Sequence, residues 1–287
     1  MTTEPVKSVA YATLLTNDGY VDAALTLAQS LRNTNTTHPL VALVTPDSVS
    51  EPSRARLRTL FDDVLPVAPL SGVSAANLAL IGRPDLHATL TKLHFWSLAY
   101  SRVLYLDADT LLLANVDHLF DLPESVTFAA APELGFPDCF NAGVMLITPD
   151  EQTYTDLLDF AKYHESFDGG DQGLLNVFFG DGTRGHPVKE LLHKKCDLDA
   201  TKTPGNKPSS RNWYRLSFTY NMEMHKVYRM YISAVHRYKD EHKILHFIGK
   251  DKPWHFPDGK VDDEGDTSAY SKFYIDMVGK WWEIGSL

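Results

Sequence analysis

The chain has few of the features that mark secreted or membrane proteins. It contains two cysteines in 287 residues, Cys139 and Cys196, too few for a disulfide framework. No apolar run approaches the roughly 18 residues that a membrane-spanning helix needs. The segment 1–7 is polar and lacks the charged, then apolar, layout of a signal peptide. We therefore expect a cytoplasmic protein without a membrane span.

Basic residues are also in deficit. Lys and Arg number 27 against 37 Asp and Glu, which gives a formal net charge of −10. Binding nucleic acid without regard to sequence needs a basic face, so we predict no nucleic-acid partner. Hydrophobic residues make up 44% of the chain, and no flexible linker divides it. This composition favours one folded domain spanning 1–287.

The first part of the chain alternates strand patterns with helix patterns. Apolar runs rich in β-branched residues predict strands at 8–15, 40–44 and 64–67, and helical spacing predicts helices at 21–31 and 51–61. This order is typical of a doubly wound parallel sheet, an α/β fold that commonly binds nucleotides. No Gly-x-Gly-x-x-Gly follows the first strand, so an ordinary dinucleotide site is not expected.

Two carboxylates, Asp107 and Asp109, follow the apolar run 103–106. In open parallel sheets, ligands bind beyond the carboxyl ends of the strands. Two hard oxygen ligands one residue apart can hold Mg²⁺ or Mn²⁺ for a nucleotide diphosphate. However, Asp-x-Asp recurs at 197–199 without a strand before it. An isolated copy of so short a motif is more often a polar turn, so the metal hypothesis depends on its context.

Two other segments offer candidate functional residues. Two glycines separate Asp168 from Asp171, and such a turn could aim both carboxylates into one cleft. Equally, Asp171 could simply cap the helix that follows. His246 alternates with apolar neighbours, and a lone histidine in that setting is more often a satisfied core residue than a ligand. Apolar residues at helical spacing along 269–282 predict a C-terminal helix that packs on the core or on a partner.

Six segments occur together in a fixed order. They read TNDGY, LTKLHFW, LDADT, PDCFNAG, FDGGDQG and HFIGKDKPW, and they begin at residues 16, 90, 106, 137, 167 and 246. In this order the chain resembles the family of retaining glycosyltransferases that contains glycogenin and galactinol synthase. The resemblance runs from about residue 9 to residue 254 and is far more specific than Asp-x-Asp alone.

The resemblance implies a GT-A fold, in which a Rossmann-like, mostly parallel sheet is flanked by helices and joined to an acceptor-side subregion. Residues from about 8 to 135 would form the nucleotide-binding half of a single domain. Residues from about 136 to 260 would form the sugar and acceptor half. Residues 261–287 would contain the C-terminal helix.

The resemblance also implies a role for each candidate site residue. Mn²⁺, or alternatively Mg²⁺, would be bound by Asp107, Asp109 and His246. The uridine pocket would be lined by Leu14, Thr16, Asn17, Tyr20, Arg83, Ala88 and the backbone near Asp107, including Ala108. Gly249 and Lys252 would hold the diphosphate. The donor sugar would be held by Lys92, Asn141, Ala142, Asp168, Asp171 and Gln172.

The implied reaction moves an α-linked hexose, with glucose favoured, from a UDP-sugar to an acceptor hydroxyl. The metal and Lys252 would stabilise the charge that develops on departing UDP, while Asp168, Asp171 and Gln172 would act beside the sugar. Retention could use a covalent intermediate on Asp171 or same-face attack by the acceptor. The alternatives are a transferase using UDP-galactose or UDP-N-acetylglucosamine on a polyol or glycan, and a non-catalytic UDP-sugar-binding protein.

The resemblance leaves the acceptor open. Glycogenin glucosylates one of its own tyrosines, and counting forward from Tyr220 and Asn221 places Tyr228 at that position. The surrounding segment 225–231 is basic, whereas the glycogenin segment is rich in serine. The acceptor is therefore either Tyr228 or the hydroxyl of a separate molecule. A homodimer is suggested by the resemblance alone.

Overall fold

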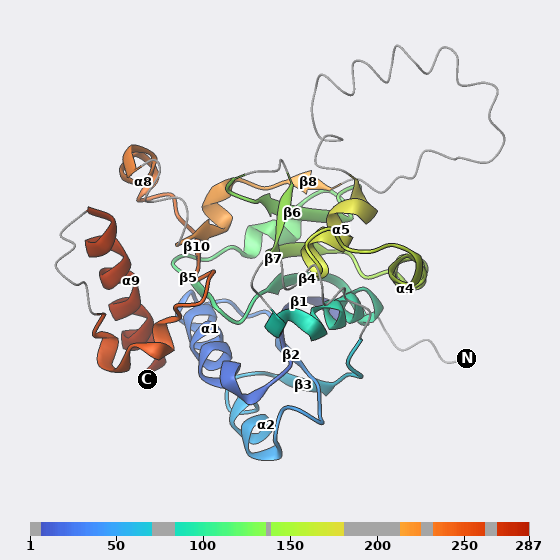
Figure 1. The fold of residues 1–287 in the computed structure, drawn as a ribbon, viewed down its shortest axis with the longest axis horizontal. Helices are drawn as coiled ribbons and strands as arrows, with labels where there is room; N and C mark the ends of the chain where they lie inside the picture. The colour runs from blue at the N-terminus through green and yellow to red at the C-terminus, as the bar shows by residue number, and fades with distance from the viewer. Residues whose placement is uncertain are drawn as a thin grey trace, which may run out of the picture.

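A seven-stranded sheet runs through the middle of the molecule (Figure 1). The computed structural model describes residues 7–70, 84–135, 139–180, 213–224, 232–261 and 269–286. The strands, in their order across the sheet, are β3 (Asp63–Pro66), β2 (Leu40–Val44), β1 (Lys7–Leu15), β4 (Tyr100–Leu106), β7 (Phe140–Ile147), β6 (Phe128–Pro132) and β8 (Tyr214–Arg215). Strands β3, β2, β1 and β4 are mutually parallel, whereas β7 is antiparallel to both β4 and β6.

The sheet is apolar on both faces because packed elements cover both of them. Along β4, Leu104 and Leu106 face one buried cluster that includes residues of α1 (Val21–Asn33) and α9 (Ala269–Gly285). Val103 and Tyr105 face the other, which includes residues of η2 (Pro84–Ser97), α4 (Glu151–Tyr163) and α5 (Asp171–Phe179). Strands buried on both sides read as continuous apolar runs, which is the pattern that the sequence displays at 103–106.

Helices α2 and α4 each begin at a side-chain cap. Ser50 caps α2 by accepting a hydrogen bond from the Ser53 N–H, and Asp150 caps α4 in the same way from Thr153. The α-helices are α1 (Val21–Asn33), α2 (Glu51–Leu57), α4 (Glu151–Tyr163), α5 (Asp171–Phe179), α8 (Ile232–Tyr238) and α9 (Ala269–Gly285). The 3₁₀ helices are η1 (Asp18–Tyr20), η2 (Pro84–Ser97), η3 (Asp117–Asp121), η5 (Phe218–Tyr220), η6 (Pro253–His255) and η7 (Pro257–Gly259).

A second, three-stranded sheet lies beside the first. It consists of β5 (Thr110–Leu112), β10 (Ile244–His246) and β9 (Met222–Glu223), with β10 in the centre. Strand β10 is antiparallel to β5, and His246 is paired with Thr110. The chain enters β5 directly after Asp107 and Asp109. The register of this small sheet therefore places His246 beside the two aspartates.

The opening strand and helix pattern predicted from the sequence is confirmed, with small differences at the ends. Helix α2 ends at Leu57 rather than at residue 61. The backbone tightens there into turns, in which the Thr59 N–H bonds to the carbonyl of Arg56 and the Leu60 N–H to that of Leu57. The helix predicted within 261–287 is α9. No helix in the described ranges is both long and apolar enough to cross a bilayer.

Candidate active site

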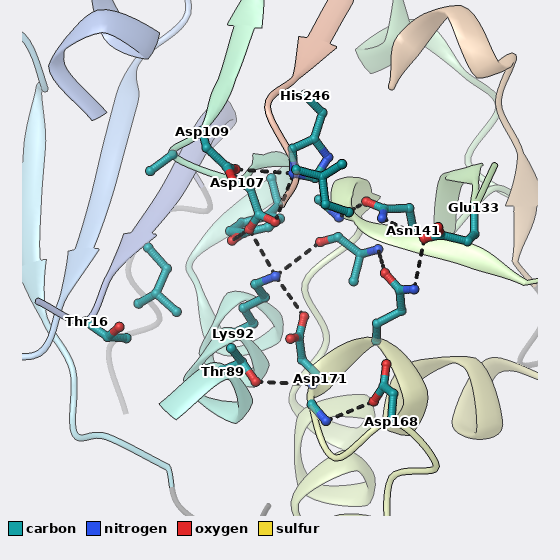
Figure 2. Close-up of a pocket in the computed structure, with 18 of the residues that line it drawn as sticks. Thr16, Thr89, Lys92, Asp107, Asp109, Glu133, Asn141, Asp168, Asp171 and His246 are labelled. Atoms are coloured by element: carbon teal, nitrogen blue, oxygen red, sulfur yellow. Dashed lines mark hydrogen bonds and ion pairs between the residues drawn. The ribbon is translucent and has the colours of Figure 1, made fainter. Parts of the chain in front are cut away.

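A cavity of about 530 Å³ opens beyond the carboxyl ends of β1 and β4. Figure 2 shows side chains from both halves of the chain converging on it. Of the residues that the sequence nominated, the cavity is lined by Leu14, Thr16, Asn17, Tyr20, Lys92, Asp107, Ala108, Asp109, Asn141, Ala142, Asp168, Asp171, Gln172 and His246. The described residues Ala88, Gly249 and Lys252 do not line it. Arg83 and Tyr228 lie outside the described residues.

Asp107, Asp109 and His246 form a compact cluster that could hold a metal ion. One potential ligand atom from each lies within 4.8 Å of the other two. The imidazole Nε2 of His246 is 3.2 Å from Asp109 Oδ1 and 3.8 Å from Asp107 Oδ2. Its Nδ1 is 2.9 Å from the side-chain oxygen of Asn221. An Nδ1–H that donates to this oxygen leaves the Nε2 lone pair free to bind a metal, as is usual for metal-bound histidines.

Backbone hydrogen bonds hold the cluster in place. The Asp107 N–H donates to the Gly143 carbonyl at 2.8 Å, and the Thr110 N–H closes a turn onto the Asp107 carbonyl at 3.0 Å. The Phe247 N–H donates to the Asp109 carbonyl at 2.9 Å, which ties β10 to the same turn. The three side chains therefore sit on a hydrogen-bonded scaffold shared by both sheets.

Each aspartate of the pair contacts a buried lysine. The Lys252 ammonium donates to Asp109 Oδ2 at 2.5 Å and to the Phe247 carbonyl at 2.8 Å. The Lys92 ammonium lies 3.0 Å from Asp107 Oδ1 and 2.7 Å from Asp171 Oδ2. Two lysines thus face three carboxylates, so the group keeps a net negative charge while His246 is neutral. This charge and the oxygen and imidazole donors fit a divalent cation.

The surrounding charges shift the pKa values of the cluster. Burial would raise the pKa of Asp109, but Lys252 and then His246 outweigh it and hold that pKa well below its usual range. Burial also opposes protonation of His246. The Asp109 carboxylate nevertheless raises the pKa of His246 above 6.5. Metal binding at His246 therefore competes with a proton that these carboxylates stabilise.

Asp168 and Asp171 play different parts in the turn that they share. Asp168 accepts hydrogen bonds from the backbone N–H groups of Gly170 and Gly173 at 2.8 and 3.0 Å, so it braces the start of α5. The N-cap of α5 is Gly170, and the Asp171 carboxylate faces the cavity, where it pairs with Lys92. The interpretation of Asp171 as a simple cap is therefore wrong. Burial raises the pKa of Asp171.

Glu133 is a site residue that sequence reasoning missed. Its Oε2 accepts hydrogen bonds from the side-chain amides of Asn141 at 2.9 Å and Gln172 at 3.1 Å (Figure 2). The Gln172 oxygen in turn accepts from the Ala142 N–H at 3.0 Å. Glu133 follows β6, and the antiparallel pairing of β6 with β7 brings it to the cavity. Only its position just before the PDCFNAG segment could have drawn attention to it.

Other lining residues also went unpredicted: Thr89, Tyr105, Cys139, Gly143, Phe167, Gly170 and Ile248. Tyr105 lies two residues before Asp107 on β4, and its hydroxyl donates to Asp107 Oδ1. Thr89 accepts a hydrogen bond from the Asp171 N–H at 3.2 Å. Thr89 and Tyr105 lie just outside the six ordered segments, and their place in the site depends on the side chains that they contact.

Comparison with known proteins agrees with this geometry. The sequence matches Glycosyl transferase family 8 over residues 12–257. It is 42% identical over 278 residues to glycogenin-1 of Homo sapiens, covering 96% of this chain and 71% of the relative. It is 38% identical over 276 residues to glycogenin of Neurospora crassa, covering 96% of this chain. The chain spans only 34% of that relative's length.

Solved structures share the fold at low sequence identity. The glycosyltransferase GlyE of Streptococcus pneumoniae superposes with a TM-score of 0.57 at 20% identity, over 98% of this chain and 61% of that one. LgtC, solved with donor and acceptor sugar analogs, gives 0.53 at 17% identity over 95% of both chains. The chain therefore belongs to glycosyl transferase family 8 and has the GT-A fold that its sequence predicted.

Proposed function

We propose that this glycosyltransferase is metal-dependent and transfers α-linked glucose from UDP-glucose to an acceptor hydroxyl with retention of configuration. The observation that carries the proposal is the meeting of two charged groups in one cavity. The first is the potential metal site Asp107, Asp109 and His246. The second is the buried ion pair between Lys92 and Asp171. The Lys92 ammonium also contacts Asp107, so this pair adjoins the metal site.

The first group suits a nucleotide diphosphate. When bound, a divalent cation would neutralise the negative charge that develops on the leaving UDP. Lys252 would add a fixed positive charge beside it, because Asp109 and the Phe247 carbonyl already hold the ammonium in place. The carboxylate ligands suit Mn²⁺ and Mg²⁺. The family resemblance favours Mn²⁺, with Mg²⁺ as the alternative ion.

The second group suits the donor sugar. A partly positive anomeric carbon forms as the bond to UDP breaks, and the Asp171 carboxylate would stabilise it. This role is common to a covalent intermediate on Asp171 and to same-face attack. Asn141 and Gln172 present amides whose orientation is fixed by Glu133. Asp168 would act by holding the turn that carries Asp171.

The identity of the donor and of the acceptor rests on the relatives. Similarity to glycogenins of 38% to 44% over most of the chain supports glucose as the donor sugar. The acceptor is either Tyr228 or a separate hydroxyl, and a homodimer and a cytoplasmic location remain predictions. Transfer from UDP-galactose or UDP-N-acetylglucosamine to a polyol or glycan, and UDP-sugar binding without transfer, are alternative outcomes of the experiment below.

Intact-mass spectrometry tests the proposal directly. The purified chain would be incubated with Mn²⁺ and UDP-glucose, UDP-galactose or UDP-N-acetylglucosamine, without an added acceptor. Whole-hexose increments with UDP-glucose alone, absent in Tyr228→Phe, would establish self-glucosylation. An unchanged mass together with UDP release on addition of a polyol or oligosaccharide would establish a separate acceptor. Mn²⁺-dependent UDP binding without turnover under any of these conditions would contradict the proposal.

A further inference from the structure

Lys252 lies on a loop that neither sheet supports. The loop 248–256 leaves β10 and contains only the short turn η6 (Pro253–His255). Lys252 is nevertheless 4% exposed, which is unusual for a lysine, and it points inward onto Asp109. An ordered, buried lysine on such a loop requires support from a neighbouring element.

Helix α9 supplies that support through two hydrogen bonds. The indole N–H of Trp282 donates to the Pro253 carbonyl at 3.0 Å, and the Tyr274 hydroxyl donates to the Asp251 carbonyl at 3.4 Å. These two carbonyls belong to the residues on either side of Lys252. In Figure 1 the orange turn after β10 runs alongside the red helix α9. The loop is therefore held between the aspartate pair and the C-terminal helix.

A chain of aromatic rings continues from α9 to the cavity. Trp281 packs on Trp254 with ring centroids 5.7 Å apart, and Trp254 meets Tyr20 edge to face at 5.4 Å. Tyr20 lines the cavity near Thr16 and Asn17. The Lys252 ammonium lies 6.0 Å from the centroid of the Trp254 ring. Contacts from α9 thus reach both Lys252 and the wall predicted to receive the nucleoside.

We propose that α9 is a positioning element of the donor site and that Trp282 is its principal positioning residue. By holding the Pro253 carbonyl, Trp282 fixes the backbone from which Lys252 reaches the diphosphate. This inference rests on the proposed function, because it assumes that Lys252 binds the diphosphate. Trp282 does not line the cavity, so it would act through Lys252.

Trp282→Phe tests this role because it keeps an aromatic ring and removes the N–H donor. Titration calorimetry with Mn²⁺ would compare the affinity for UDP, which has phosphates, with that for uridine, which has none. Loss of one hydrogen bond corresponds to a fall of roughly two- to tenfold in an equilibrium constant. We expect a loss of this size for UDP and no change for uridine. In transfer assays, kcat should fall more than KM rises.

Two further variants separate positioning from a general loss of stability. Val278→Ala weakens the packing of α9, since Val278 is fully buried on that helix, but it leaves the Trp282 hydrogen bond intact. It should lower the melting temperature without selective loss of UDP affinity. The inference is overturned if Trp282→Phe has no effect, if UDP and uridine weaken equally, or if Val278→Ala reproduces the selective loss.

Lys252→Met distinguishes failure of this inference from failure of the proposed function. It should weaken UDP but not uridine, and adding Trp282→Phe to it should cause no further loss, because both changes act through one group. A neutral Lys252→Met would remove Lys252 from the diphosphate site and overturn this inference, whereas the proposed function, which rests on the metal site and the Lys92–Asp171 pair, would still be tested by the mass experiment. A selective effect of Lys252→Met with a neutral Trp282→Phe would overturn the role of α9 alone.

Discussion

The site concentrates charge on residues that are almost fully buried. Lys92, Asp109, Asp171, His246 and Lys252 are each less than 10% exposed. Removing ions from water is costly, and buried ion pairs often stabilise a fold no better than apolar side chains of the same size. Their burial in one charged cluster is therefore better explained by binding a charged donor than by stability. The titration of His246 is one measurable consequence of this buried charge.

The pKa of His246 should make stability and metal binding respond to pH in opposite directions. Its pKa is raised above 6.5. In EDTA, its contribution to stability is thus full below pH 6.5 and is lost as pH rises through the folded-state pKa, by at most about 1.4 kcal/mol per pH unit. Mn²⁺ affinity should rise over the same interval, because the bound proton must leave. Denaturant unfolding and Mn²⁺ titration across this interval would measure the two trends.

His246→Asn is the control for this prediction. Burial lowers the pKa of His242. The contribution of His242 to stability therefore increases as pH rises towards 6.5. It is present in both proteins, and its contribution cancels when the variant is subtracted from the wild type. A difference curve that does not change with pH would show that His246 does not titrate as its surroundings imply.

At the scale of elements, strand β7 packs against the metal site. Gly143 lies on β7 next to the imidazole of His246. A Cβ added at Gly143 would overlap Cε1 of His246 and come within 2.8 Å of its Nδ1. The neighbouring backbone is also fixed, since the Gly143 carbonyl accepts from the Asp107 N–H. A side chain at position 143 would therefore collide with His246, and glycine allows β10 to pack closely against β7.

Gly143→Ala should displace His246 and weaken Mn²⁺ binding by roughly 10- to 100-fold, the range found when a group supporting a metal ligand is lost. Crowding in the core should also cost about 1–3 kcal/mol of stability. The matched control is Gly279→Ala on α9, where an added Cβ meets nothing within 4 Å. It should stabilise by about 0.5–1 kcal/mol and leave Mn²⁺ binding unchanged. Mn²⁺ titration and denaturant unfolding of both variants would check this, and normal Mn²⁺ affinity in Gly143→Ala would contradict it.

At the scale of the whole molecule, the potential metal site lies where the two sheets meet. Asp107 follows β4 of the large sheet, whereas His246 lies on β10 of the small one. Helix α9 also connects distant parts, because it packs on α1 and on the loop that carries Lys252. A ligand that binds between the sheets should therefore stabilise the molecule as a unit.

Mn²⁺ and UDP together should raise the melting temperature. At free concentrations near 100 times the dissociation constant, binding adds about 2.7 kcal/mol, or on the order of 5 °C for a chain of this size. Asp109→Asn should remove both the Mn²⁺-dependent rise and transfer while leaving the circular dichroism spectrum unchanged. Calorimetric scans with Mn²⁺ and with EDTA would measure the effect. A full rise in Asp109→Asn would exclude Asp109 from metal binding.

The sequence by itself determined the fold class and predicted where the site would be centred. The run 103–106 must be a buried strand because it is apolar on both faces, and Asp107 and Asp109 must then leave its carboxyl end. The six ordered segments added the family and predicted the donor-site residues. The inferences of fold class and family succeed because strand formation and short motifs depend on neighbours along the chain.

Tertiary structure alone decided which distant residues join that centre. The local setting of His246 favoured a core residue, whereas the resemblance implied a metal ligand. The pairing of β10 with β5 is what brings its imidazole to the aspartates. Glu133 reaches Asn141 and Gln172 through the pairing of β6 with β7, and Trp282 reaches the Lys252 loop through the packing of α9. Such contacts depend on register and packing between segments far apart in sequence. The spacing of residues within a short segment therefore does not reveal these contacts.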